Sequence, residues 1–455
     1  MLKELKSHCI SGWSYYTLAI ILTALICKVS WPGFMSFDSI DALHEARTGI
    51  HWNINCPTMV IWLQGICDKI YPGPGLLFLI QVAITFIALA DILMIAAVPI
   101  LIGMPFMIFF ACCPPILGPL LVVWKDVGMM AFFLAATATL FRAQKSTSNK
   151  SFWCWASIGW TILGCSFRLN AILVALPIFY ALSKVLSGTK PKKAMLYLSL
   201  LVLSTSTTLW FINSFKFKPD ITLIDPNPAA FFQAFDILGI STLSQENMLP
   251  KEMYAAYDKF TIADLSKNYY PENSNKSFIS ITSGQKPLIW TNPNSHMMQL
   301  WQNAIIKHPK EYLCHRMKVF RVLLAIHMAE PYYLTHPGID TNDLGITFKP
   351  SRLTPYALKY LSRSSPTVFA HPWLYYLIAS ALMLLSIFFP SYRSQNVSML
   401  LSSAALNILP MFFLVASAEL RFNMWSIAAI MLSFVLIINN YLKRRPSIAS
   451  RSCAQ

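Results

Sequence analysis

Long apolar runs, separated by short polar turns, make up most of this sequence. About ten of them approach the roughly 17 to 25 residues that cross a bilayer. They lie near residues 13–31, 75–96, 98–118, 127–141, 152–167, 171–187, 194–212, 372–390, 397–417 and 424–442. The pattern predicts an all-α polytopic membrane protein with about ten transmembrane helices. The third run contains Pro105, Pro114, Pro115 and Pro119, so we expect it to be broken.

A polar stretch interrupts the apolar runs between residues 213 and 370. It is too long for a simple connection, which predicts a soluble, mainly helical outer domain. Helical spacing is clearest near Phe231 and from His296 to Met328, with a break at Pro309. The expected organisation is therefore an N-terminal transmembrane module with the catalytic outer loops at 1–212, the outer domain at 213–370 and C-terminal transmembrane helices at 371–455.

Composition supports the membrane assignment, because 55% of the residues are hydrophobic and only 12% are charged. The net charge of +16 does not predict nucleic-acid binding, since the basic residues form short clusters between the runs rather than one patch interleaved with aromatic residues. The ten cysteines are scattered and form neither a disulfide framework nor a CxxC pair. The first run has no small-residue cleavage site after it and is interpreted as an uncleaved membrane helix.

The distribution of basic residues predicts the orientation. When the spans are threaded with the N-terminus inside, every inner loop is basic and nearly free of acid, as the positive-inside rule requires. These basic residues are Lys3, Lys6, Arg142, Lys145, Lys150, Lys184, Lys190, Lys192, Lys193, Arg393, Lys443, Arg444 and Arg445. Both termini are then cytoplasmic, and the acidic turns face outward.

The first outer loop, from Trp31 to Pro57, is rich in acidic residues. If it is helical, Asp38, Asp41 and Glu45 share one face within reach of one bound group. Asp38 is the candidate general base for an acceptor hydroxyl or amine, although a solvated loop carboxylate is the simpler alternative. Asp41 is expected to share that work, to bind a divalent cation or to cap a helix. Two carboxylates at this spacing are also compatible with a glycoside hydrolase.

A second outer turn carries Lys125 and Asp126, and a third carries Arg168 and Asn170. Asp126 is expected to join Asp38 while Lys125 contacts a phosphate, unless Trp124 and Lys125 merely anchor the membrane interface. Arg168 opposes the positive-inside bias, which predicts an anionic ligand. Phosphate is the natural one because a guanidinium binds it bidentately.

A late outer turn contains Glu419 and Arg421. The two either form a local ion pair or leave Arg421 as a second phosphate ligand. Asp91 lies toward the inner end of its run, where a packing role is expected. The histidines show no HExxH-like spacing, so no zinc site is predicted.

These features together resemble the GT-C superfamily of polytopic glycosyltransferases, which includes protein O-mannosyltransferases and bacterial aminoarabinose and arabinofuranosyl transferases. The shared layout consists of an acidic loop after the first span, a KDV turn after a proline-broken span, an RLNA turn, a large outer domain and a late ELRF turn. The segment WQNAIIKHPKEYLCHRMKVF also resembles a W…HP..YL.HR…F segment of related bacterial membrane proteins.

The resemblance implies inverting transfer of a sugar from a polyprenyl-phosphate-linked donor to a lipid, glycan or protein acceptor. It also implies a bacterial inner-membrane protein whose site faces the periplasm. No cofactor is certain, and a divalent cation stays open. In that family the first loop carries the catalytic carboxylate, which matches Asp38, and the second turn often carries another, which matches Asp126. Basic residues hold the donor phosphate, and the residues in matching positions are Lys125, Arg168 and Arg421.

The sequence departs from the family pattern in two places. Many relatives end the first loop with a histidine-proline pair, whereas Asn55-Cys56-Pro57 stands here with His51 nearby. The Asp-Glu pair of the mannosyltransferases is absent too, because Ser39 follows Asp38. A transporter or flippase for a lipid-linked or anionic substrate is the main alternative, although it predicts more charge at mid-membrane. A lipid-dependent ligase or acyltransferase and a non-catalytic assembly protein are further alternatives.

Overall fold

The structure is a computed structural model. It describes residues 2–51, 56–168, 170–188, 190–214, 218–219, 229–250, 261–281, 296–326, 333–389, 392 and 394–444. Within these ranges the regular secondary structure is helical, apart from a parallel pair of two-residue strands, β1 (Ile50–His51) and β2 (Lys218–Pro219), and isolated bridges. The predicted all-α class is therefore confirmed.

Every predicted apolar run is helical. The helices are α1 (Leu2–Ser30), α4 (Gly75–Ile95), α5 (Ile100–Cys112), α6 (Pro114–Leu120), α7 (Lys125–Lys145), α8 (Lys150–Ser166), α9 (Ala171–Ser187), α10 (Pro191–Ser214), α17 (Pro372–Phe388), α18 (Gln395–Ile408) and α20 (Met424–Arg444). Among the described residues, six helices are long and apolar enough to cross a membrane, and a seventh span results if α5 and α6 count as one. These two meet at an angle of 61° beside Cys113, which confirms the break predicted from the prolines. Helices α8, α9 and α17 have 17 residues each, which explains why fewer than ten meet the length criterion.

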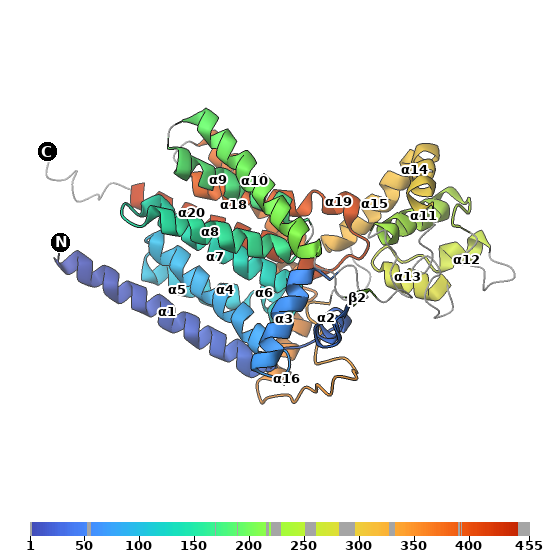
Figure 1. The fold of residues 1–455 in the computed structure, drawn as a ribbon, viewed down its shortest axis with the longest axis horizontal. Coiled ribbons are helices and arrows are strands. Elements are labelled where there is room, and N and C mark those ends of the chain that lie inside the picture. Colours follow the sequence, from blue (N-terminus) through green and yellow to red (C-terminus); the bar gives the residue numbers. More distant parts are fainter. Residues whose placement is uncertain are drawn as a thin grey trace.

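Helix α7 lies at the centre of the bundle and packs against α4, α8, α9 and α20. Its small and aliphatic residues are buried on all sides because neighbours surround it. In contrast, α10 lies on the outside, where Leu196, Leu203 and Trp210 are exposed. Figure 1 shows these helices side by side, with α10 along one edge and α1 along the other. An outer helix that is apolar on its exposed face is suited to lipid.

Basic residues gather at one end of the bundle. Arg142 in α7 pairs with Asp91 in α4, with Arg142 Nε 2.7 Å from Asp91 Oδ2. Lys443 at the end of α20 donates to the Ala96 carbonyl at 2.6 Å, and Lys145 donates to the neighbouring Ile95 carbonyl. Asp91 therefore has the packing role expected of it. We call this end of the bundle the basic end.

The remaining elements lie at the opposite end, which we call the site end (Figure 1). They are α2 (Phe37–Thr48), α3 (Thr58–Ile70), α11 (Ala230–Ser244), α12 (Ile262–Lys267), α13 (Ser274–Ile281), α14 (Met297–Lys307), α15 (Pro309–Leu323), α16 (Thr354–Ser364), η3 (Val368–Ala370), α19 (Met411–Leu414) and η5 (Leu420–Asn423). The helices predicted near Phe231 and on both sides of Pro309 are confirmed as α11, α14 and α15.

The described part of residues 213–370 lies in two places. Helices α11, α14 and α15 bury Phe235, Leu238 and Val319 in a second core, which Met411 of α19 completes. Farther along the chain, Ile339 returns to the first loop and forms a parallel bridge with Met35. Whether this stretch is a separate soluble domain stays a prediction.

Candidate active site

The backbone brings the first loop and the second turn together. Phe34 donates its amide to the Leu121 carbonyl at 2.9 Å, and Val123 donates back to the Phe34 carbonyl at 2.9 Å. Ser39 Oγ donates to the Val123 carbonyl at 2.6 Å. Gly33 makes this approach possible, since a Cβ there would lie 2.6 Å from the Val123 side chain and its φ is +103°. The start of α2 is thereby fixed beside the start of α7.

The three acidic residues that helical spacing places on one face of α2 differ in their exposure to solvent. Asp38, in the first turn of α2, is 39% exposed and pairs with Arg421. Asp41 and Glu45 follow on the same helix but are buried, with exposed fractions of 5% and 0%. Packing of α2 against α3 buries these later turns. That one bound group reaches all three carboxylates stays a prediction.

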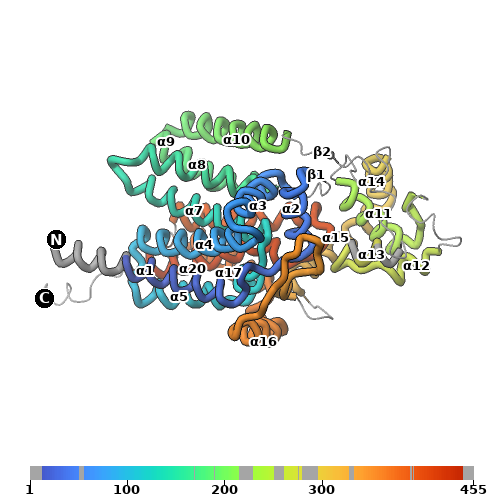
Figure 2. The backbone as a smooth tube through the Cα atoms, turned by 60° about the horizontal axis from the view of Figure 1, so that its bottom comes forward, coloured from blue at the N-terminus to red at the C-terminus, as the bar shows by residue number. Residues whose placement is uncertain are grey.

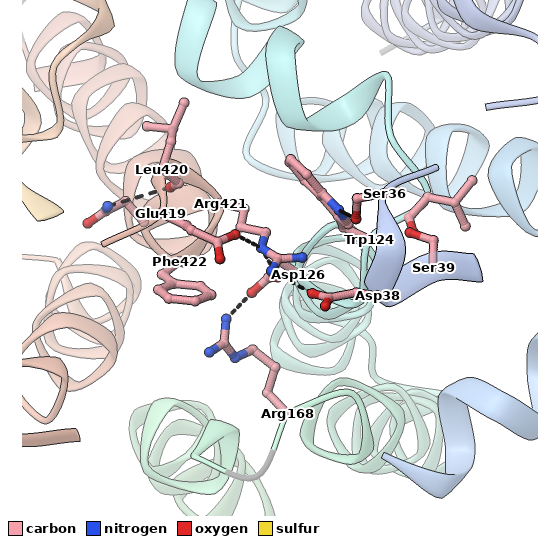
Figure 3. A network of polar contacts seen from close by, with 12 residues as sticks. Ser36, Asp38, Ser39, Trp124, Asp126, Arg168, Glu419, Leu420, Arg421 and Phe422 are labelled. Atoms are coloured by element: carbon pink, nitrogen blue, oxygen red, sulfur yellow. Dashed lines mark hydrogen bonds and ion pairs between the residues drawn. The ribbon is translucent and has the colours of Figure 1, made fainter. Parts of the chain in front are cut away.

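Arg421 occupies the centre of the site, at the start of the turn that leads into α20. Its Nη2 lies 2.6 Å from Asp38 Oδ2, and its Nε lies 2.5 Å from Glu419 Oε2 and 3.7 Å from Asp126 Oδ2. Figure 3 shows the guanidinium among these carboxylates. The local ion pair expected between Glu419 and Arg421 is present, and Arg421 also reaches both acidic residues predicted for the outer loops.

A second guanidinium approaches from the turn before α9. Arg168 Nη1 pairs with Asp126 Oδ1, and the Asp126 side chain is fully buried. Asp126 therefore lies between Arg168 and Arg421 and links the two cations. Charge-assisted bonds of this kind fix both guanidinium groups in direction as well as in place.

Aromatic rings hold the two arginines. The Arg421 guanidinium carbon lies 4.8 Å from the centre of the Trp124 ring, and that of Arg168 lies 4.3 Å from the Phe422 ring. Trp124 is itself fixed, because its indole Nε1 donates to Ser36 Oγ at 2.8 Å. The planar guanidinium groups are thus preorganised by stacking and by ion pairs together.

A small cleft opens beside Arg421. Its lining combines charged, polar and apolar side chains, namely Asp38, Ser39, Ala42, Cys56, Val60, Gln64, Leu77, Gln81, Val123, Trp124, Lys125 and Arg421. Three atoms of the lining residues are buried without a hydrogen bond among the described residues, namely Arg421 Nε, Arg421 Nη1 and Gln81 Oε1. Because Nε has the Glu419 ion pair, the donor Nη1 and the acceptor Gln81 Oε1 are the two left without a partner within the described part of the chain. Unsatisfied buried groups are costly, so the cleft is matched to a ligand that offers an acceptor and a donor.

The charges around Asp38 control its ionisation. Burial by itself raises the pKa of this carboxyl, but the positive charges of Arg421, Lys125 and Arg168 outweigh it and hold the pKa below its usual value. Asp38 is therefore ionised at neutral pH and down to pH values below the ordinary carboxyl range. Burial raises the pKa of the neighbouring Cys56 thiol, so that this residue lines the cleft as a neutral group.

The segment that carries Arg421 is anchored from the other core. Arg316, fully buried in α15, bonds Asp236 at 2.6 Å and donates to the Val415 carbonyl at 2.7 Å. The Ala418 amide donates to the Glu272 carbonyl at 3.1 Å. The helices around α11 and α15 thus hold the chain on the N-terminal side of Glu419 and Arg421.

The structure gathers most of the predicted site residues at one place. These are Asp38, Lys125, Asp126, Arg168, Glu419 and Arg421. Asn170 lies two residues after Arg168, and its Nδ2 is buried without a partner in the described part of the chain. The side chain of His51 lies outside the described residues.

Sequence reasoning missed Gln64, Gln81 and Phe422, and it treated Trp124 as a membrane anchor only. A glutamine in an apolar run, such as Gln81, is the one signal that was available. Among the residues that the structure describes, no group of three or more His, Cys, Asp or Glu side chains is placed to hold a metal ion.

The fold and the site define a polytopic helical membrane protein with a buried carboxylate and arginine cluster at one end of the bundle. No protein-family model matches the chain, and no curated protein matches its sequence. The structure is similar to that of ArnT from Cupriavidus metallidurans bound to undecaprenyl phosphate, with 11% identity and a TM-score of 0.32 over 95% of this chain and 77% of that one.

Proposed function

We propose that the protein is an inverting membrane glycosyltransferase that uses a polyprenyl-phosphate-linked sugar donor. The observation that carries this proposal is the buried, unsatisfied Arg421 Nη1 in a cleft that Asp38 also lines. A guanidinium with a spare donor is suited to a phosphate oxygen, and the adjacent carboxylate is suited to an acceptor proton. Gln81 Oε1, from another residue that lines the cleft, offers an acceptor for a sugar hydroxyl.

The position of the cleft supports a lipid-linked donor. It lies where α4 and α7 begin, at the site end of the bundle. There a phosphate can occupy the polar cleft while its isoprenoid chain lies between helices. The acceptor is a lipid, glycan or protein that approaches from the same side.

The proposed reaction exchanges one bond at the anomeric carbon. Asp38 accepts the proton of the acceptor hydroxyl, and the acceptor oxygen attacks the anomeric carbon from the side opposite the phosphate. The bond between that carbon and the phosphate oxygen breaks, and the polyprenyl phosphate leaves with the electron pair. Arg421 and Arg168 stabilise the charge that develops on the phosphate.

Binding of the donor activates Asp38 in this scheme. In the structure Arg421 Nη2 holds Asp38 Oδ2 at 2.6 Å, which makes the carboxylate a weak base. A phosphate that draws the guanidinium toward itself weakens this pairing, so the pKa of Asp38 rises when the substrate is present. The base therefore becomes effective only when a donor occupies the cleft.

Lipid-linked sugar profiling of cells with and without the protein tests the proposal. We expect a polyprenyl-phosphate sugar to accumulate in its absence, on the face of the membrane where the site lies. Donor that accumulates on the cytoplasmic face instead would identify a flippase. An unchanged lipid-linked sugar pool would contradict both.

The outward orientation of the site is tested separately by cysteine labelling. Cys314 on α15 is exposed at the site end, whereas Cys9 and Cys453 lie in the segments predicted to be cytoplasmic. We expect a membrane-impermeant maleimide to label Cys314 in intact spheroplasts, and Cys9 and Cys453 only after permeabilisation. Because Cys112 at the end of α5 is also exposed, the experiment is done in a Cys112→Ser background, where the control Cys314→Ser should remove the signal from intact spheroplasts. Labelling of Cys314 that requires permeabilisation would overturn the orientation.

A further inference from the structure

Helix α16 (Thr354–Ser364) lies beside the ends of two membrane helices. Thr354 Oγ1 donates to the Val29 carbonyl at the end of α1 at 2.6 Å, and Tyr360 OH donates to the Cys112 carbonyl at the end of α5 at 2.7 Å. The η3 turn follows α16 and leads directly into α17. Figures 1 and 2 show α16 on the flank of the bundle at the site end of α1. It therefore lies level with the site ends of the apolar helices α1 and α5.

The outer face of α16 combines aromatic and basic side chains. Leu361 is buried toward the bundle, whereas Tyr356, Lys359 and Arg363 are exposed, Tyr356 by 74%. Tyrosine, lysine and arginine are typical of the boundary between lipid and water, because each has an apolar stem and a polar end. The composition of this face is that of an interfacial helix.

The charge of the surrounding segment has one sign. Residues 344–370 contain four basic residues, Lys349, Arg352, Lys359 and Arg363, and no acidic residue. All four are exposed. The positive-inside rule places such clusters at the basic end of the bundle, but α16 lies at the site end. The orientation of the protein in the membrane therefore does not explain these four basic residues. An anionic partner at the site end explains them.

We infer that α16 and the basic residues before it form a docking surface for the anionic head groups of phospholipids in the leaflet at the site end. Lys349, Arg352, Lys359 and Arg363 meet the lipid phosphates, and the exposed Phe369 of η3 enters the acyl boundary. A soluble polyanion would complement the charges but leave Phe369, 58% exposed, and Tyr356 in water. The surface therefore favours a lipid, and it keeps α16 flat against the membrane beside α1.

Native mass spectrometry of the detergent-purified protein tests this inference. The protein is mixed with phosphatidylglycerol and phosphatidylcholine of equal acyl chains and, separately, with undecaprenyl phosphate. We expect wild-type protein to retain phosphatidylglycerol over phosphatidylcholine. The variant with Lys349, Arg352, Lys359 and Arg363 all changed to Gln is expected to retain roughly tenfold less phosphatidylglycerol, since each basic group contributes separately to anionic-lipid binding. The matched control, Lys310→Gln with Lys318→Gln, removes exposed charges from α15 and should retain as much as wild type.

Three outcomes would overturn the inference. The quadruple variant could keep its phosphatidylglycerol, the α15 control could lose as much as the quadruple variant, or the quadruple variant could lose undecaprenyl phosphate alone. The last result would assign the surface to the donor lipid. Circular dichroism of both variants confirms that helix content is unchanged, so that a loss of lipid reports on the surface.

Discussion

Asp38→Asn is expected to abolish sugar transfer while leaving the protein folded. The amide cannot accept a proton from the acceptor, and loss of a general base typically costs 10²- to 10⁴-fold in rate. The cost in stability is small, because Asp38 is 39% exposed and Arg421 keeps Glu419 and Asp126 as partners. Transfer is measured with purified protein in vesicles that contain a polyprenyl-phosphate sugar, and stability is measured by thermal unfolding.

The matched control is Asp343→Asn, which removes a carboxylate that is 75% exposed. Asp343 lies 3.4 Å from His44, which is on α2 like Asp38. This variant should transfer sugar at the wild-type rate. Asp38→Glu keeps the carboxylate but displaces it, so partial activity is expected. Wild-type transfer by Asp38→Asn would refute the assignment of the base.

The pH profile of the wild type follows from the same carboxylate. The pKa of Asp38 is lowered, so its charged form persists as the pH falls and disappears only below the ordinary carboxyl range. In the free enzyme, kcat/KM is therefore expected to show no acid limb from Asp38 between pH 5 and 8. An acid limb in that range whose midpoint shifts in Asp38→Glu would contradict the lowered pKa of Asp38.

The helices were predictable because each apolar run is an independent local signal. The charged ends were not: α7 begins at Lys125 and ends at Lys145, although its apolar run covers only 127–141. The helix continues beyond its apolar run because Asp126 is buried by its partners at one end and lysine is tolerated at the membrane boundary. Hydrophobicity alone therefore predicts a helix that is too short at both ends. The break at Cys113 followed from proline chemistry, which is equally local.

The pairing within the site could not be predicted in the same way. Asp38 and Arg421 are separated by 383 residues and Asp126 and Arg168 by 42, so no local pattern specifies who pairs with whom. Charge sign and expected sidedness brought the candidates to one face, and packing then selected the pairs. Burial of Glu45 was also decided by packing, since helical spacing does not show which part of a face another helix will cover.

Arg421→Gln is expected to eliminate binding of the donor and to destabilise the fold. Arg421 is the common partner of Asp38, Glu419 and Asp126, and its side chain is only 8% exposed. Without it, three carboxylates face one another beside Arg168 and Lys125. Breaking a buried pair from one side costs roughly 3 kcal/mol or more in the free energy of unfolding. Binding of undecaprenyl phosphate and thermal unfolding measure the two effects.

Arg421→Lys separates the role of charge from the role of geometry. Lysine restores the positive charge, so most of the lost stability should return. It cannot bond Asp38 and Glu419 and still present a donor to phosphate, because an ammonium is a point charge without the planar fork of arginine. We therefore expect a folded protein with donor affinity well below that of wild type, while Arg321→Gln, an exposed arginine on α15, changes neither property. Wild-type donor affinity in Arg421→Lys would mean that the cluster serves the fold alone, and the phosphate would then have to bind at Arg168 or Lys125.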